Sequence, residues 1–191
     1  MNEFQNFFIA GELCLDFCNT FDHLHTPPEV DHFSDGAVVL RWAQAAGILP
    51  ANKKTSVSTD ERSYKKLLQT RALLFKVFQP FAHDALPIKS DIDSLNTLLQ
   101  EKNAKVKIVL DAKRFLSTFE ADDAFEKIEY ETIRSAAELL LSITPGRLKQ
   151  CEGCGWLFYD RSRTHARRWC TMDLCGNRAK ARRHYERVRQ K

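Results

Sequence analysis

The chain has 191 residues, of which 43% are hydrophobic and 28% are charged. These values predict one globular domain, or one domain with a small appendage, and exclude a wholly disordered chain. There is no run of about 18 uncharged apolar residues, so no membrane-spanning helix is expected. No lysine or arginine precedes Arg41, so the start of the sequence lacks the basic region of a secretory signal. We therefore expect a cytoplasmic protein.

The net charge of +4 is unevenly distributed along the chain. Residues 147–191 contain 13 lysines and arginines and 4 acidic residues, which gives +9 and leaves −5 for residues 1–146. Four of the six cysteines also lie in the basic segment. We predict two domains, 1–146 and 147–191, separated at Thr144-Pro145-Gly146, and a polyanionic partner for the second.

Hydrophobic periodicity predicts a mainly helical first domain. A helix is expected over residues 35–49, ended by Gly47 and Pro50. The capping box Ser58-x-x-Glu61 should begin a long helix that Pro80 ends or kinks. Two more helices are expected over residues 91–100 and 125–143.

A strand pattern interrupts these helices. Residues 105–110 alternate as a strand does, and residues 114–119 can pair with them as a hairpin. The first domain is therefore expected to be helical with one small β-hairpin. The fold class of the chain is mainly α, or α+β.

The first domain offers few groups for catalysis. Cys14 and Cys18 lie four residues apart, with His23 and His25 shortly after them. They could form a second metal site or a nucleophile pair, but no third group orients them, and we favour two small buried hydrophobic side chains. The sequence shows neither a phosphate-binding glycine loop nor paired carboxylates that stand out. We expect a protein that is not an enzyme, although a ligand-binding pocket in residues 1–146 remains open.

The basic segment carries a cysteine pattern typical of zinc sites. Its spacing is C-x2-C-x15-C-x4-C, formed by Cys151, Cys154, Cys170 and Cys175. Four thiolates close the shell of one zinc ion, so the site is expected to be structural. An iron–sulfur site and a ligand role for His165 are weaker alternatives, since nothing suggests redox chemistry and His165 falls in a predicted loop.

The predicted module around this ion is treble-clef-like. It consists of a knuckle, a hairpin of residues 156–159 with residues 167–170, and a helix after Cys175. One face of that helix should pack inward through Leu174, Ala181, Tyr185 and Val188. Trp156 and Trp169 are expected to form a small core, and Asn177 is expected to brace the zinc loop.

Basic residues of the helix and of the preceding loop are candidates for binding nucleic acid. They are Arg161, Arg163, Arg167, Arg168, Arg178, Lys180, Arg182, Arg183 and Arg187. The alternative is a solvated basic surface that balances the charge of a zinc–tetrathiolate centre.

The motifs of both domains resemble known families. The segment of residues 147–187 contains CGWLFYD and CGNRAKARRH, and it resembles the CGNR zinc finger, which is named after Cys175-Gly176-Asn177-Arg178. The shorter segment GELCLDFCNT resembles the Leu-Asp-Phe-x-Asn-Thr signature of the ABATE domain, although Cys14 and Cys18 stand where that family usually has aliphatic residues. The resemblance implies a stress-induced bacterial transcription regulator.

Three functions follow from these features. The first is a DNA-binding regulator whose finger holds DNA, while residues 1–146 sense a signal or pair with another copy. A homodimer is expected there because single fingers bind DNA weakly. The second is an RNA- or ribosome-associated zinc module, and the third is an adaptor that binds other proteins.

Overall fold

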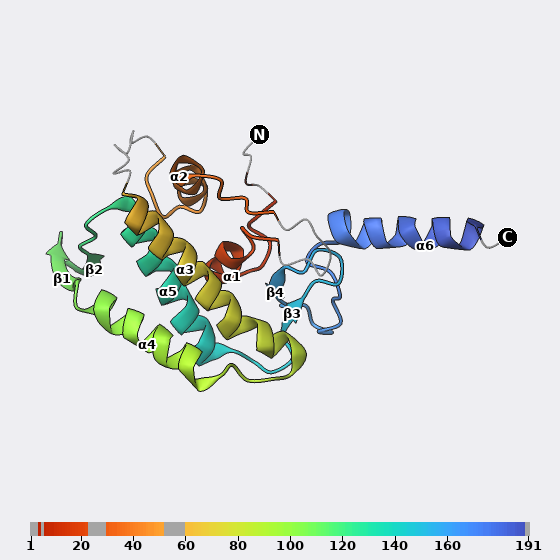
Figure 1. Cartoon of the computed structure of the whole chain (residues 1–191). Helices are drawn as coiled ribbons and strands as arrows, with labels where there is room; N and C mark the ends of the chain where they lie inside the picture. Colours follow the sequence, from red (N-terminus) through yellow and green to blue (C-terminus); the bar gives the residue numbers. More distant parts are fainter. Residues whose placement is uncertain (1–3, 5, 23–29, 52–59, 190–191) are drawn as a thin grey trace.

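The structure is a computed structural model that describes residues 4, 6–22, 30–51 and 60–189. Its larger part is helical, and two small antiparallel hairpins complete the fold (Figure 1). The helices of this part are α1 (Leu13–Cys18), α2 (Gly36–Ala45), α3 (Glu61–Phe78), α4 (Lys89–Asn103) and α5 (Ala124–Ser142), with the 3-10 helix η1 (Gln79–His83). The mainly α fold class is therefore confirmed. None of the described helices is long and apolar enough to cross a lipid bilayer.

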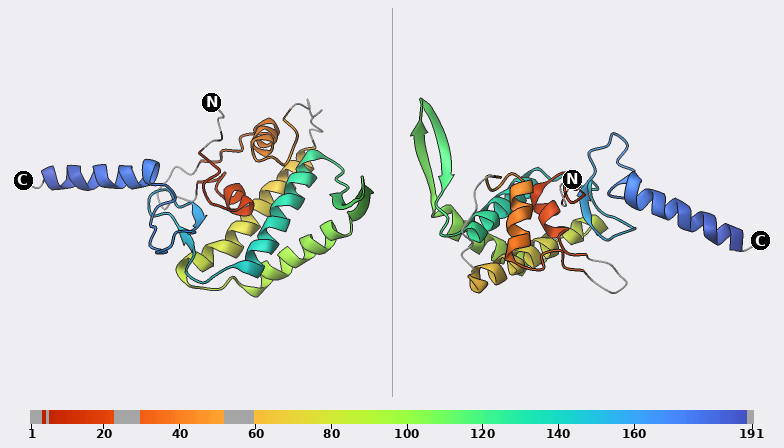
Figure 2. Two further views of the ribbon diagram at one scale, coloured as in Figure 1. Left: turned by 180° about the vertical axis from the view of Figure 1, so that it is seen from behind. Right: turned by 90° about the horizontal axis from the view of Figure 1, so that it is seen from above.

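The core of the helical part lies around α3 and α5, which pack against each other (Figures 1 and 2). Helix α1 lies against both, α4 packs on their other side, and α2 contacts α5. The largest fully buried side chains include Trp42, Phe17 and Phe78. These helices thus bury the apolar stripes that the sequence predicts.

Aspartate caps fix where three of the helices begin. The side chains of Asp35, Asp60 and Asp123 accept hydrogen bonds from the first-turn N–H groups of α2, α3 and α5. The predicted capping box needs Ser58, which lies outside the described residues. At the other end of α3, Pro80 follows directly in η1, as predicted.

The first hairpin matches its prediction. Strands β1 (Val106–Asp111) and β2 (Arg114–Phe119) pair antiparallel, from Val106 opposite Phe119 to Asp111 opposite Arg114. The two residues of the turn, Ala112 and Lys113, both have positive φ, which suits the twist of a tight hairpin.

The second hairpin uses a different strand from the one predicted. Strand β4 (Leu157–Tyr159) pairs with β3 (Leu148–Gln150), and residues 167–170 form no strand. The prediction was wrong because the chain turns back within the first cysteine pair, so the zinc knuckle itself is the hairpin turn. The short π-helix η2 (Met172–Gly176) then leads into helix α6 (Asn177–Arg189).

Helix α6 corrects a second prediction. It projects away from the rest of the molecule, and none of its residues is buried (Figure 1). Tyr185 is 70% exposed and Val188 is 58% exposed, although both were expected to pack inward. The finger is too small to cover more than the start of the helix, where Leu174 and Ala179 are half-buried.

Candidate metal centre and nucleic-acid interface

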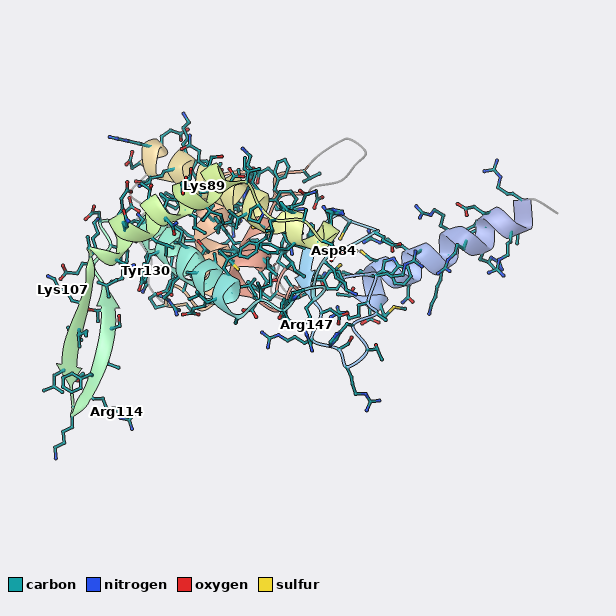
Figure 3. All side chains as sticks on the ribbon, turned by 90° about the horizontal axis from the view of Figure 1, so that it is seen from below. Asp84, Lys89, Lys107, Arg114, Tyr130 and Arg147 are labelled. Carbon is teal, nitrogen blue, oxygen red and sulfur yellow. The ribbon has the colours of Figure 1, made fainter. Side chains whose placement is uncertain are left out.

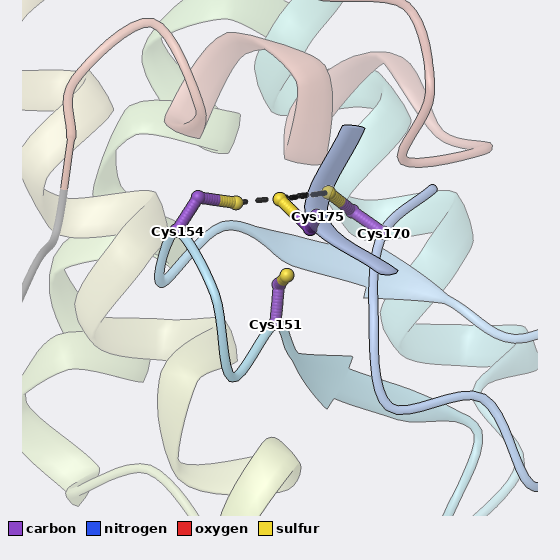
Figure 4. A group of neighbouring side chains, drawn as sticks. All are labelled: Cys151, Cys154, Cys170 and Cys175. Carbon is purple, nitrogen blue, oxygen red and sulfur yellow. Dashed lines mark hydrogen bonds between the residues drawn. The ribbon is translucent and has the colours of Figure 1, made fainter. Parts of the chain in front are cut away.

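Four cysteine sulfurs converge in the C-terminal module (Figure 4). The Sγ atoms of Cys151, Cys154, Cys170 and Cys175 all lie within 4.8 Å of one another. The Sγ of Cys170 is 3.6 Å from that of Cys154 and 3.7 Å from that of Cys175. Tetrahedral zinc with Zn–S bonds of about 2.3 Å requires sulfurs about 3.8 Å apart. The donor set therefore fits a single Zn²⁺, and it closes the shell.

The knuckle is shaped by its backbone. The Cys151 N–H donates to the Trp156 carbonyl at 2.8 Å, and the Gly155 N–H donates to the Cys151 carbonyl at 2.9 Å. Gly155 has φ +74°, a conformation that other residues rarely adopt. The Gly153 N–H points at the Cys151 sulfur, 3.4 Å away, as expected for a donor to a thiolate. This turn brings the first two ligands together.

A buried carboxylate organises the loop between β4 and the third ligand. Asp160 is fully buried and accepts hydrogen bonds from the N–H groups of Ser162, at 2.9 Å, and Arg167, at 3.1 Å. Burial alone would raise the pKa of Asp160, but these hydrogen bonds and nearby Lys149 lower it to about 2. The anionic side chain thus holds the loop in place of the strand that the sequence predicted.

The other candidate metal ligands are not part of this cluster. His165 lies exposed in the loop with φ +49°. Cys14 and Cys18 are fully buried in α1, and burial raises the pKa of the Cys14 thiol to about 12. His23 and His25 lie outside the described residues. Within the part of the chain that the structure describes, the four-cysteine cluster is the one group of metal-binding side chains found.

The finger is fastened to the helical part through Asn19, which follows α1. Its Nδ2 donates to the Leu157 carbonyl at 2.9 Å, and its Oδ1 accepts from the Leu157 N–H at 2.9 Å. The side chain thereby pairs with β4 as a neighbouring strand would, and it is fully buried. This role was not predicted from the sequence, in which the only signal is that Asn19 belongs to the Leu-Asp-Phe-x-Asn-Thr motif.

Two further residues of the N-terminal segment join the same contact. Asp16 accepts hydrogen bonds from the N–H groups of Ile9 and Ala10, and the Ala10 carbonyl accepts from Tyr159 at 2.8 Å. Burial raises the pKa of Asp16 to about 7 despite these hydrogen bonds. The Trp156 indole donates to Asp22 at 2.9 Å, so this tryptophan anchors the finger to the body.

Arg71 fixes the chain beyond Asn19. It is buried in α3, forms a two-pronged ion pair with Asp31 at 2.8 and 2.6 Å, and donates to the Thr20 hydroxyl at 2.9 Å. Residues 16–20 of the motif, together with Arg71, therefore fix the N-terminal segment against which the zinc finger packs.

The nine predicted nucleic-acid-binding residues differ in their surroundings. Three already have partners within the chain: Arg161 pairs with Glu12, Arg167 donates to the Cys170 carbonyl, and Arg168 pairs with Glu152. On α6, Arg182 lies 4.0 Å from Glu186, and Arg183 donates to the Ala179 carbonyl. The remaining four, Arg163, Arg178, Lys180 and Arg187, have neither a side-chain hydrogen bond nor an ion pair within the described ranges.

A basic cleft of about 410 Å³ separates α6 from the knuckle. It is lined by Glu152, Gly153, Arg168, Trp169, Cys175, Arg178, Ala179, Arg182 and Arg183. Trp169 lies under the Arg168 guanidinium, 5.0 Å from its ring centre. Near the start of α6, the Asn177 side chain donates to the Asp173 carbonyl at 3.3 Å, in keeping with a bracing role. Four arginines, from the finger and from α6, therefore line one cleft.

Comparisons with known families agree with this geometry. Residues 147–188 match the CGNR zinc finger, and residues 11–142 match the ABATE domain, described as "Putative stress-induced transcription regulator". The chain belongs to the ABATE family. The ABATE match contains the segment that carries Asn19, and the CGNR match contains all four cysteines. No curated protein matches the chain.

Proposed function

We propose that this protein is a DNA-binding transcription regulator whose zinc finger places α6 in the major groove. One observation carries the proposal. Helix α6 leaves the zinc centre exposed on all sides, and its 13 residues include six basic side chains and one acidic side chain. It is about 20 Å long, and the major groove of B-DNA is about 12 Å wide and admits an α-helix.

The arrangement of side chains around α6 supports this placement. At 100° per residue, Ala181, Tyr185 and Val188 form one apolar strip. Basic rows flank the strip on both sides, with Arg178, Arg182 and Arg189 in one row and Lys180, Arg183 and Arg187 in the other. In the groove, the strip would meet base edges and thymine methyl groups while the two rows reach phosphates of the two strands.

The basic cleft provides a second contact beside the helix. Arg178 and Arg182 project into it from α6, and Arg168 faces them from the finger. The neighbouring Glu152 is neutralised by Arg168, so the cleft favours an anion. We place one backbone phosphate there, because arginine forks match phosphate oxygens. The zinc ion, when bound, supplies the rigidity that holds the knuckle against the start of α6.

The remaining parts of the proposal concern the whole protein. A closed four-thiolate site has no open position for a reacting water, so we assign no catalytic role. Reduced thiolates suit the cytoplasm, where we place the protein. We also propose that two copies act together, because one finger offers an interface of only about 600–1,000 Å².

The test is selection of the zinc-loaded protein against random duplex DNA at about 150 mM salt. Enrichment of a defined site supports the proposal. A preference for structured RNA at equal salt would instead indicate an RNA- or ribosome-associated zinc module. If the protein shows no salt-sensitive binding to either nucleic acid, the remaining function is that of an adaptor that binds other proteins.

A pair of variants tests whether α6 makes the contacts. About five phosphate contacts give a slope of log K against log salt near −4.5. The double variant Arg178→Gln with Arg182→Gln should flatten that slope by about 1.8. The matched control is Lys76→Gln with Lys89→Gln, which removes the same charge from exposed positions of the helical part and should leave the slope unchanged. Equal slopes for the two double variants would contradict the assignment.

A further inference from the structure

The β1–β2 hairpin extends from the helical part at the end of the molecule opposite α6 (Figure 2). Lys107 lies near its base and Arg114 at its tip, and Tyr130 of α5 lies beside the base (Figure 3). Contact with the body is made there, where Phe119 stacks on Tyr130 with ring centres 4.0 Å apart. Beyond this contact the strands are exposed, and a two-stranded hairpin alone is only marginally stable in water.

One face of the hairpin is apolar. Residues paired across antiparallel strands share a face, so Val106 with Phe119, Ile108 with Ser117, and Leu110 with Phe115 form what we call the apolar face. Its outer side chains are highly exposed, at 77% for Ile108, 67% for Leu110 and 78% for Phe115. The opposite face carries Lys107, Asp111, Arg114 and Thr118 along with Val109 and Leu116.

This pattern is that of a sheet with one covered face and one solvated face. No described element of the chain covers Ile108, Leu110 or Phe115. We propose that the apolar face packs against the same face of a second copy, forming a symmetric dimer. This inference deepens the two-copy part of the proposed function, and it does not depend on DNA binding.

The chemistry of the hairpin favours a second copy as the occupant. The apolar face carries no charge, so its partner must present an uncharged apolar surface, which an identical face provides. The charges at the two ends are complementary. The tip has Asp111, Lys113 and Arg114, a net charge of +1. At the base, residues 120–126 contain four acidic residues, three of which pair with Lys102, Lys105 and Lys107, so residues 102–107 and 120–126 together have a net charge of −1. Antiparallel packing across a two-fold axis places each tip beside the partner's base.

The area available predicts a weak dimer. Each strand has six residues and is about 20 Å long. The three outer side chains contribute about 300 Å² of apolar surface per copy, so the two hairpins together bury about 600 Å² of apolar surface. That is below the standard size of a stable interface, so we expect a dissociation constant of about 1–100 µM.

The test is sedimentation equilibrium of the zinc-loaded full chain, without DNA, from 1 to 300 µM. We expect a reversible monomer–dimer equilibrium for the wild type. Ile108→Glu places a charge on the apolar face and should raise the dissociation constant at least tenfold. Thr118→Glu adds the same charge on the opposite face and should change it less than threefold. Circular dichroism and zinc content of both variants check that the fold is retained.

Cross-linking gives an independent measurement. Ser117→Cys places a thiol on the apolar face and should form an intermolecular disulfide on mild oxidation, whereas Thr118→Cys should not. A monomer at 300 µM, or equal cross-linking of the two variants, overturns the proposal. If the protein stays monomeric in these experiments but still binds a specific DNA site, the dimer alone is refuted. A dimer that selects no DNA site would refute only the DNA-binding function.

Discussion

The hydrogen bonds of Asn19 give a sharp test of how the finger is held. Replacing Asn19 with alanine removes both hydrogen bonds to Leu157, and the site is fully buried. No other partner replaces the amide, because the two backbone groups already face the space that it fills. The substitution therefore leaves one buried N–H and one buried C=O unsatisfied.

The magnitude follows from the cost of those two groups. Each buried polar group left unpaired costs about 1–3 kcal/mol, so Asn19→Ala should lower the free energy of unfolding by about 2–6 kcal/mol. Asn19→Asp keeps an acceptor for the Leu157 N–H but turns a carboxylate oxygen toward the Leu157 carbonyl. It also buries a charge, so it should destabilise the protein at least as much at pH 7.

Urea unfolding at saturating zinc, followed by tryptophan fluorescence, measures the effect, since Trp156 lies at the same contact. Gln69→Ala removes an amide from the exposed surface of α3 and should stay within about 0.5 kcal/mol of the wild type. Amide exchange in residues 148–159 should rise in Asn19→Ala. A variant as stable as the Gln69→Ala control would refute the strand-like role of Asn19.

Three further predictions concern zinc, pH and the ion pair of Arg71 with Asp31. Chelation should release one zinc ion per chain and unfold the finger, since structural zinc contributes about 10–16 kcal/mol, and Cys151→Ser should reproduce this in metal content and circular dichroism. Because burial raises the pKa of Asp16 to about 7, its neutral form is the one that the fold favours. Its contribution to stability should be present below pH 4 and lost as pH rises toward 7, and urea midpoints from pH 5 to 8 should fall less steeply in Asp16→Asn. Arg71→Met removes the hydrogen bonds of the buried guanidinium to Asp31 and Thr20, and because Asp31 is exposed and can be hydrated, the cost should be about 1–3 kcal/mol in urea unfolding. A cost below about 0.5 kcal/mol would show that the pair is not structural.

Local patterns predicted much of the fold. Helices α2, α3 and α5 follow apolar stripes and end near glycine or proline, and these signals depend on a few neighbouring residues. The four zinc ligands were also predictable from the sequence, because the spacing of the cysteines limits which sulfurs can meet around one ion. Alternation also gave the β1–β2 hairpin, whose tight turn joins adjacent strands.

The errors arose where pairing is not local or where a partner is missing. Strands β3 and β4 have three residues each, too few for a period of two to be visible. The apolar strip of α6 indicated burial, yet a stripe does not tell what covers it, and the chain leaves Tyr185 exposed. Nothing near Asn19 in the sequence shows that its amide will pair with a strand 138 residues away.

The two proposals together restrict how the protein can bind DNA. The hairpin and α6 lie at opposite ends of the molecule (Figure 2). A dimer joined through its hairpins therefore places its two α6 helices far apart, at the ends of an elongated particle. Such a dimer cannot read two half-sites one helical turn apart, because that spacing needs recognition helices about 34–36 Å apart. Selected sites should instead contain single, non-palindromic motifs or widely separated repeats, whereas a compact palindrome would require the copies to meet near α6 and would refute the hairpin dimer as the DNA-bound form.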